Sequence, residues 1–280
     1  MSKSVQSETT VKFRDGLPHT EVDLLVVEEP LEIRLGYGPE GQRQQLTVTV
    51  TMRTPGHDEE LCVGFLFTEG IIEKSQDVLS AKYCGNLEYP DEQENVMRVE
   101  LHPNINVDLN LVQRNFYTSS SCGVCGKASL ESLKVDCSTL ADVDFSISSD
   151  TISSLPEKLT AAQNVFEFTG GLHAAGIFDA KGEIMLLRED VGRHNALDKL
   201  IGASLLKGNI PCSDAILVLS GRVSFDLVQK AIRAGISTIA AVGAPSSLAV
   251  EVARSFGVTL IGFLKEHKFN IYCGEHRIKV

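Results

Sequence analysis

The sequence predicts an α/β protein with two parts, a smaller β-rich α+β domain and a larger domain in which helices cover a sheet. Strand-like segments dominate the first part, helices and strands alternate in the second, and a Ser-, Gly- and Cys-rich stretch without a hydrophobic period separates them. The expected segments are a flexible N-terminus over 1–20, the β-rich domain over 21–116, a mobile loop over 117–129, a connector over 130–158 and the α/β domain over 159–280.

In the first part, residues 22–37 and 45–53 are predicted strands. The second alternates strictly, with hydrophobic side chains on one face and threonines on the other. Pro55 and the glycine after it turn the chain, and residues 57–72 are then predicted to be a helix, because acidic residues in its first turn favour the helix dipole. Residues 80–112 contain further strand-like pieces separated by turn residues.

The second part repeats a regular alternation of elements. The predicted elements are a helix over 157–170, a β-hairpin over 173–189, helices over 194–208, 224–235 and 245–257, and strands over 214–220, 237–243, 258–264 and 269–274. Strands that alternate with helices, each closed by glycine, imply a three-layer domain with helices on both faces of one sheet. Pro245 is expected in the first turn of its helix.

Composition limits the function of the chain. Its 280 residues, 43% hydrophobic and 22% charged, are typical of a globular protein with a sizeable core. A net charge of −11 and only 6% aromatic residues disfavour nucleic acid or an anionic membrane as the main partner. The N-terminus lacks the pattern of a signal peptide and no apolar stretch has the length of a membrane span, so we expect a soluble, cytoplasmic protein.

Seven cysteines, an odd number scattered along the chain, argue against a disulfide framework. Apolar surroundings predict that Cys62 and Cys212 are buried, whereas Cys84 and Cys273, each followed by glycine, are expected to be partly accessible.

Cys122 and Cys125 differ from the others because they lie three positions apart in a polar loop with Lys127. Such a pair can bind a metal, close a disulfide or supply a nucleophile, and the lysine favours a thiolate. A zinc site needs a second pair with matching spacing, which the chain lacks, so no structural metal is expected. A thioredoxin-like pair should open a helix after a strand, and this loop does not. The pattern therefore favours a nucleophilic thiol loop.

Two more motifs lie where a predicted strand meets the start of a helix. Residues 188–199 carry Arg193, and residues 220–224 carry Gly221 and Arg222. Helix N-termini bind anions, arginine adds a charged fork, and parallel strands present their carboxyl ends at one edge of a sheet. We therefore expect the two junctions to face each other across one crevice; the alternative for residues 188–199 is a capped helix with a solvated charged face.

A segment near the C-terminus is the next candidate binding site. Residues 262–270 carry two lysines and a histidine that could receive phosphates, and a polar hairpin explains the same run equally well. His173, in the segment TGGLHAAG, has a structural or a functional role with equal weight.

The motifs resemble a known family in their order. The chain carries SSSCGVCG, TGGLHAAG, REDVGRHNALDKLIG, SGRVSFDLVQKAIRAGI and VGAPSSLAVEVARSFGVTLIGF, as in the FdhD/NarQ family of formate dehydrogenase accessory sulfurtransferases. The resemblance covers most of the chain and implies a cytidine-deaminase-like C-terminal domain. The zinc pattern of a deaminase is absent, because His194-Asn195-Ala196 stands in place of H-x-E and Ser220-Gly221-Arg222 near the place of P-C-x-x-C, so no catalytic zinc is implied.

The resemblance implies a sulfur carrier. A cysteine desulfurase passes a sulfane sulfur to the protein as a persulfide, and the protein transfers it to the molybdenum bis-guanine-dinucleotide cofactor that formate dehydrogenase needs. By resemblance, Cys122 is the persulfide position and Cys125 its partner. The implied cofactor-binding stretch consists of Phe263, Leu264, Lys265, Glu266, His267 and Lys268. The expected partners are the desulfurase, formate dehydrogenase and the cofactor, and a homodimer is an open expectation.

Two other classes of function stay open. A plain dithiol oxidoreductase needs only the cysteine pair and leaves the basic junctions without a role. A non-catalytic chaperone for the cofactor or the dehydrogenase leaves the cysteine pair idle. A deaminase is the third alternative, and it requires zinc.

Overall fold

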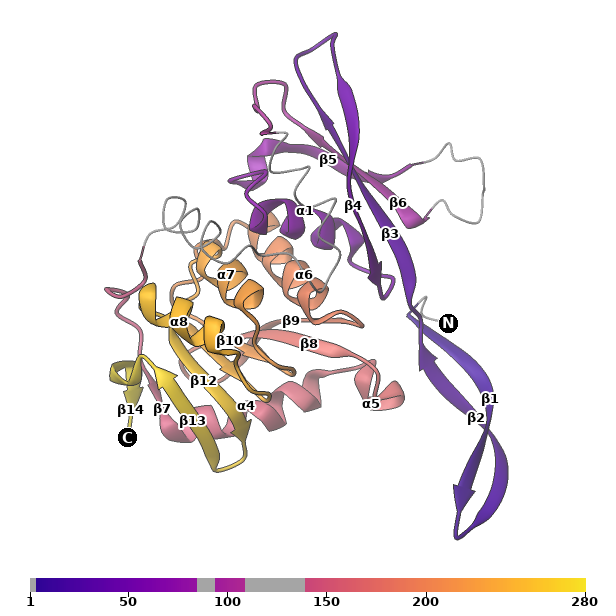
Figure 1. Cartoon of the computed structure of the whole chain (residues 1–280), viewed down its shortest axis with the longest axis vertical. Helices are drawn as coiled ribbons and strands as arrows, with labels where there is room; N and C mark the ends of the chain where they lie inside the picture. Colours follow the sequence, from indigo (N-terminus) through magenta and orange to yellow (C-terminus); the bar gives the residue numbers. More distant parts are fainter. Residues whose placement is uncertain (1–3, 85–93, 109–138) are drawn as a thin grey trace.

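The computed structural model describes residues 4–84, 94–108 and 139–280. In this part of the chain the strands form a six-stranded sheet, a four-stranded sheet and two pairs of strands, and there are six α-helices. Figure 1 shows a long hairpin that projects from the body, an upper layer with the four-stranded sheet, and a lower α/β body. No helix among the described residues is long and apolar enough to cross a membrane.

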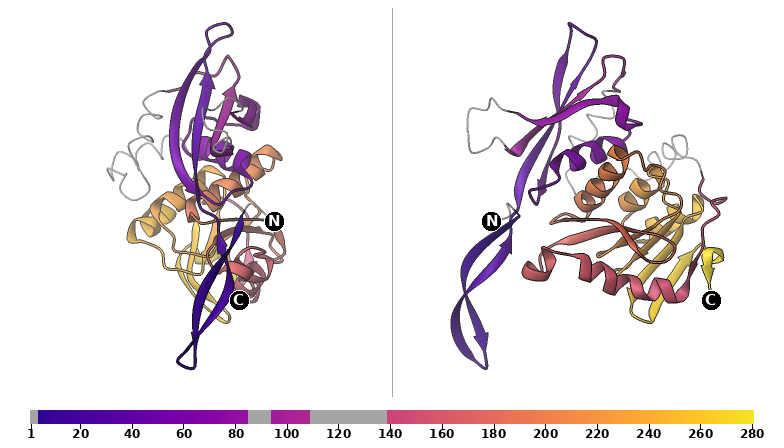
Figure 2. Two further views of the ribbon diagram at one scale, coloured as in Figure 1. Left: turned by 90° about the vertical axis from the view of Figure 1, so that its right-hand side faces the viewer. Right: turned by 180° about the vertical axis from the view of Figure 1, so that it is seen from behind.

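The N-terminal hairpin corrects the expectation of a flexible segment over 1–20. Strands β1 (Val5–Arg14) and β2 (Leu17–Val26) pair antiparallel along their whole length and project from the body (Figures 1 and 2). Asp15 and Gly16 both have positive φ, 53° and 79°, which suits a tight two-residue hairpin turn. The predicted strand over 22–37 is therefore two strands, because β2 ends at Val26 and β3 begins at Glu29.

The four-stranded sheet is covered by one helix. Its strands are β3 (Glu29–Tyr37), β4 (Gln44–Arg53), β5 (Val78–Tyr83) and β6 (Val96–Leu101), in the order β4-β3-β6-β5. Helix α1 (Asp58–Thr68) follows the turn after Pro55. The predicted strand at 45–53 and helix within 57–72 are confirmed, whereas residues 105–108, part of a predicted strand, are not in a strand.

The six-stranded sheet forms the centre of the C-terminal part. Its strands are β8 (His173–Phe178), β9 (Ile184–Asp190), β10 (Ile216–Leu219), β11 (Thr238–Ala241), β12 (Thr259–Lys265) and β13 (Lys268–Cys273), in the order β13-β12-β11-β10-β8-β9. Strands β10, β11 and β12 are parallel to one another, and the flanking strands pair antiparallel. The predicted strands of this part are confirmed.

Helices cover both faces of this sheet, as expected. Helices α6 (Arg193–Leu206), α7 (Phe225–Arg233) and α8 (Ser247–Ser255) lie on one face and α4 (Ser149–Ala162) on the other (Figure 1). Successive side chains of β10 point to opposite faces of the sheet. Leu217 and Leu219 lie in the core shared with α6–α8, and Ile216 and Val218 lie in the core shared with α4. Helix α8 begins after Pro245, with Ser246 as its N-cap.

The connector over 130–158 also needs correction, because α4 begins at Ser149, with Ser148 as its N-cap, and the boundary at 159 falls inside this helix. A short helix, α5 (Phe166–Thr169), follows it. Strand β14 (Ile278–Lys279) pairs with β7 (Ile147–Ser148), so the end of the chain lies beside the start of α4.

The two parts of the molecule share one core. Helix α1 packs against the four-stranded sheet on one side and against α6 on the other. The two helices cross at Gly64 and Gly202, where a Cβ atom on either glycine would overlap backbone of the facing helix. The glycines permit this close approach, which packs α1 of the N-terminal part tightly against α6 of the C-terminal part.

Candidate functional site

The strand–helix junctions meet at one edge of the six-stranded sheet. Strands β10, β11 and β12 end there, and β8 begins there because it runs antiparallel to β10. His173, at the start of β8, pairs with Asp190, at the end of β9. A Cβ atom at position 221 would lie 3.2 Å from Nδ1 of His173 and 3.9 Å from Cδ of Arg193. The structure therefore places Gly221, Arg193 and His173 against one another.

Backbone hydrogen bonds join three successive loops at this edge. Gly243 donates its N–H to the carbonyl of Gly221 at 3.1 Å, and Phe263 donates to the carbonyl of Gly243 at 3.1 Å. A Cβ atom at position 243 would lie 2.7 Å from the backbone nitrogen of Arg222, so glycine is required for this approach. The loops after β10 and β11 and the end of β12 are thus held together by main-chain contacts.

Arg193 places a guanidinium group at the N-terminus of α6. It is the first residue of α6 after the Gly192 N-cap, and its Nε is buried without a hydrogen-bond partner among the described residues. An unsatisfied buried donor costs about 1–3 kcal/mol, and more when it is charged. An anion at this helix N-terminus would satisfy the guanidinium and meet free N–H groups. Arg222, in the loop after β10, is exposed to solvent.

Two histidines at the edge are held neutral. Burial, followed by repulsion from Arg193, lowers the pKa of His173. Burial, followed by Arg193 and Lys230, lowers the pKa of His194 to about 4. His194 Nε2 lies 3.2 Å from Oγ of Ser224, the N-cap of α7. Both rings therefore act near neutral pH as neutral hydrogen-bonding groups, and they add no positive charge to that of the arginines.

The junction after β9 is anchored by a buried carboxylate. Asp190 is fully buried; its Oδ2 lies 2.6 Å from Nζ of Lys199 and accepts from Thr54 N at 3.2 Å, and its Oδ1 accepts from Gly192 N at 2.8 Å. Lys199 in turn donates to the carbonyl of Thr54 at 2.8 Å. The charged run over 188–199 is therefore not a solvated face: its buried members attach the start of α6 to the N-terminal part.

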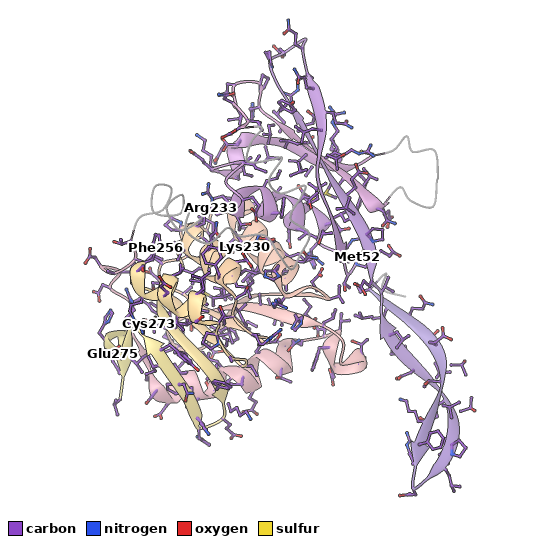
Figure 3. All side chains as sticks on the ribbon, in the orientation of Figure 1. Met52, Lys230, Arg233, Phe256, Cys273 and Glu275 are labelled. Atoms are coloured by element: carbon purple, nitrogen blue, oxygen red, sulfur yellow. The ribbon has the colours of Figure 1, made fainter. Side chains whose placement is uncertain are left out.

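A second buried ion pair involves Asp198, the residue that precedes Lys199 in α6. Lys230 of α7 donates to both carboxylate oxygens of Asp198 at 2.9 Å and to Thr68 at 2.8 Å, and it lies 3.2 Å from Glu69. Figure 3 labels Lys230 and Arg233 on α7, the helix that these bonds tie to the end of α1. Motif analysis missed this anchoring role, since pairing between helices leaves no local signal.

The C-terminal stretch divides into three environments. Phe263 is exposed, with φ of 54°, and its backbone belongs to the edge described above. The Leu264 side chain is fully buried in the core beneath the sheet, so it is not available to a ligand. The remaining candidates lie exposed at the turn between β12 and β13, namely Lys265, Glu266, His267 and Lys268.

The cysteine pair at 122 and 125 lies outside the described residues. Of the other cysteines, Cys62 is buried as predicted. Cys212 is only half-buried and Cys273 is buried, which corrects both expectations; Cys273 donates to the carbonyl of Val258 in the core between β12 and β13. Cys84 is half-buried, as predicted.

Comparison with known proteins shows the family of the chain. The sequence model of the FdhD/NarQ family matches residues 26–279. The chain belongs to the FdhD/NarQ family. A relative from Mycolicibacterium paratuberculosis, named sulfur carrier protein FdhD, is 50% identical over 91% of this chain and 92% of its own. A relative of the same name from Streptomyces avermitilis is 44% identical over 99% of this chain and 97% of its own.

The fold is also found in a solved structure. A formate dehydrogenase accessory protein from Desulfotalea psychrophila superposes with a TM-score of 0.73, at 24% identity, over 98% of this chain and 99% of that one. The FdhD/NarQ match begins at residue 26, so β1 and nearly all of β2 precede it, whereas both junctions and the β12–β13 turn lie within it.

Proposed function

We propose that the protein is a sulfur carrier that matures formate dehydrogenase. It receives a sulfane sulfur from a cysteine desulfurase as a persulfide on Cys122 and transfers it to the molybdenum bis-guanine-dinucleotide cofactor. The relatives named sulfur carrier protein FdhD support the sulfur-carrying role. The structural observation that carries the proposal is the sheet edge, where the unpartnered Arg193 Nε lies at a helix N-terminus beside Gly221.

The cofactor is the substrate, and its pyrophosphates suit this edge. Arg193 and Arg222 offer bidentate donors, and the α6 and α7 N-termini offer backbone N–H groups. Lys265 and Lys268 add point charges from the turn between β12 and β13, and the exposed Phe263 ring offers a surface on which a guanine can stack. These groups form a local cationic site in a protein with a net charge of −11.

The thiol chemistry follows from the two cysteines. The Cys122 thiolate attacks the terminal sulfur of the desulfurase persulfide, the S–S bond of the donor breaks, and the desulfurase cysteine leaves as a thiolate. Cys125 can then attack Sγ of the Cys122 persulfide, which releases hydrosulfide to the metal and leaves a Cys122–Cys125 disulfide. A thiol reductant must return two electrons to this disulfide before the next cycle.

The setting of the reaction follows from this chemistry. We place it in the cytoplasm, where a reducing environment keeps Cys122 as a thiol.

The deaminase-like arrangement of the C-terminal domain and the homodimer stay predictions. Among the described residues no three His, Cys, Asp or Glu side chains gather as a metal site.

GDP tests the proposed site, because it represents one end of the cofactor. We expect GDP to bind in a calorimetric titration, more weakly at high salt. Arg222→Ala should weaken it about tenfold, the loss of one charged hydrogen bond, and should leave persulfide formation on Cys122 intact. Lys207→Ala, on the exposed end of α6, is the control. Equal GDP affinity in the wild type and in the Arg222, Lys265 and Lys268 alanine variants would place the pocket elsewhere.

The alternative functions predict different formate dehydrogenase activities in extracts of cells that carry variants of this protein. A plain dithiol oxidoreductase would need Cys125 as much as Cys122 and would be indifferent to Arg222. A chaperone would support formate dehydrogenase activity with Cys122→Ala. The sulfur-carrier proposal requires that Cys122→Ala abolish that activity while the fold is retained.

A further inference from the structure

The outer face of the four-stranded sheet carries a row of basic side chains. The strand register pairs Arg34 of β3 with Arg98 of β6, and Arg98 with Lys82 of β5. Registered residues on neighbouring strands point to the same face, so three cations occupy a strip roughly 10 Å long. Like charges placed directly opposite each other destabilise a sheet. The row therefore needs a counter-charge.

Two carboxylates supply part of this counter-charge. Glu32 accepts two hydrogen bonds of 2.9 Å from Arg34, and these lower the pKa of Glu32. Glu100 pairs with Arg98 and accepts from Arg43 at 2.6 Å. With Lys82 included, four basic groups thus stand against two acidic groups on this face.

The row borders a hollow on the protein surface. Its volume is about 480 Å³, and its lining includes Arg34, Lys82, Arg98, Ser80 and the Cys84 thiol. The size lies in the range of small-molecule sites, about 300–1,000 Å³. Lys82 forms no ion pair with a described residue, and the Nε of Arg98 is buried without a hydrogen-bond partner there. The exposed Lys82 therefore adds to the hollow a positive charge that the described side chains do not balance.

A glycine gives the hollow its shape. A Cβ atom at Gly36 would overlap the carboxylate of Glu100, which lies across β3 at this point. Glu100 is thereby held at one end of the row, where it reaches Arg43 and the terminal nitrogen of Arg98. The other end, with Lys82 and Cys84, has no acidic side chain in the lining.

We propose that this hollow binds the phosphate group of a small molecule. Lys82 and the Ser80 hydroxyl line it beside Arg34 and Arg98, whose guanidinium groups also bind Glu32 and Glu100, and a tetrahedral dianion accepts hydrogen bonds from several such donors at once. The site is separate from the sheet edge described above, because Leu31, Ile33 and Leu35 alternate with Arg34 and its neighbours and face the core toward α1. It is independent of the proposed function.

Pyrophosphate is the probe, and Cys84 is the local reporter. Cys84 lies two residues after Lys82 and lines the hollow, so a bound anion should shield it. In the Arg222→Ala protein, which weakens binding at the sheet edge, we expect pyrophosphate to slow iodoacetamide alkylation of Cys84 at least threefold, as measured on the peptide by mass spectrometry. Alkylation of the half-buried Cys212 is the internal control and should not change.

Variants locate the effect. Arg98→Gln should raise the pyrophosphate concentration needed for protection about tenfold, and Lys82→Gln should raise it less. Arg98→Lys, which keeps the charge and loses the fork, should give an intermediate value and guards against misfolding of the glutamine variant. A titration with GDP distinguishes the source of the phosphate: protection at lower concentrations of GDP than of pyrophosphate indicates a nucleotide, and protection by pyrophosphate alone indicates the free anion. Absence of protection by both, or equal protection in the wild-type and glutamine proteins, would overturn the proposal.

Discussion

Nζ of Lys199 lies 2.6 Å from Oδ2 of Asp190, and both side chains are fully buried where the β9–α6 turn meets Thr54. The pair lies directly beneath the N-terminus of α6 that carries Arg193. The position of the arginine therefore depends on an ion pair between β9 and α6 whose two members also bind Thr54 of the N-terminal part.

Lys199→Met tests how much this ion pair contributes to the stability of the fold. Removal of one partner leaves an uncompensated buried carboxylate, which costs about 3–5 kcal/mol of unfolding free energy. The measurement is urea denaturation at neutral pH. Lys158→Met, which breaks the exposed 2.8 Å pair with Glu183, should cost less than about 1 kcal/mol. Similar losses in the two variants would show that the buried pair contributes little.

The crossing of α1 and α6 gives a second prediction. Gly202→Ala should destabilise the protein by at least about 1–3 kcal/mol, because the methyl group would overlap the Glu60 backbone and push the helices apart. Gly171→Ala is the matched control, since a Cβ there would make only ordinary contacts, with Val26 at 3.6 Å and the Thr169 carbonyl at 3.9 Å. If thermal unfolding shows both variants equally stable, the close crossing does not hold the two parts together.

His194 predicts a pH dependence of stability. Its folded pKa of about 4 lies below the ordinary 6.5, so between these values the unfolded chain binds more protons than the folded one. Stability should therefore fall as pH drops from about 6.5 to 4 and be independent of this group above that window. Its partial exposure limits the effect to about 1–2 kcal/mol.

His194→Gln should flatten that slope. The comparison must be made between the two profiles, because burial and Arg193 lower the pKa of His173 as well and its contribution has the same sign. Chemical denaturation at several pH values provides the measurement. Parallel wild-type and His194→Gln profiles would contradict a neutral, buried His194.

The ion pair between Arg188 and Glu60 gives a fourth prediction. Burial alone would raise the pKa of Glu60, but hydrogen bonds from Arg188 and His57 lower it to about 2. Arg188 donates to Glu60 at 2.5 and 2.7 Å and so ties β9 to α1. Arg188→Gln should raise the Glu60 pKa, as measured by NMR titration of its carboxyl carbon, and Arg34→Gln should leave it unchanged. An unmoved Glu60 pKa in Arg188→Gln would show that the ion pair does not form.

The elements from β8 to β13 could be predicted because each is a short apolar run with its own start and stop signals. The N-terminal hairpin of β1 and β2 could not be predicted, because its strands are rich in Ser, Thr and charged residues, and only Asp15-Gly16 marks the turn. The sequence predicted only the end of helix α4, from residue 157, because serines and Pro156 interrupt its first half, although Ile152, Leu155 and Leu159 form its buried stripe.

The candidate site shows the same limit. The order of the strands brings the loops after β9, β10 and β12 to one edge of the sheet. The alternation of strands and helices along the sequence was enough to predict this meeting of the loops. The buried pairs of Asp190 with Lys199 and Asp198 with Lys230 were not predictable, because each charge finds its partner only when helices pack. The resemblance groups Leu264 with its exposed neighbours, and only the alternation of side chains along β12, which directs Leu264 into the core, separates it from them.

Sulfur loading is the most direct test of the central claim. The full-length protein is incubated with a cysteine desulfurase and cysteine, and its intact mass and peptides are then measured without reduction. The account predicts a mass gain of one sulfur atom located on Cys122, retained in Cys125→Ser and absent in Cys122→Ser. Sulfur found equally on the half-buried Cys84 and Cys212, or loading that persists in Cys122→Ser, would contradict it.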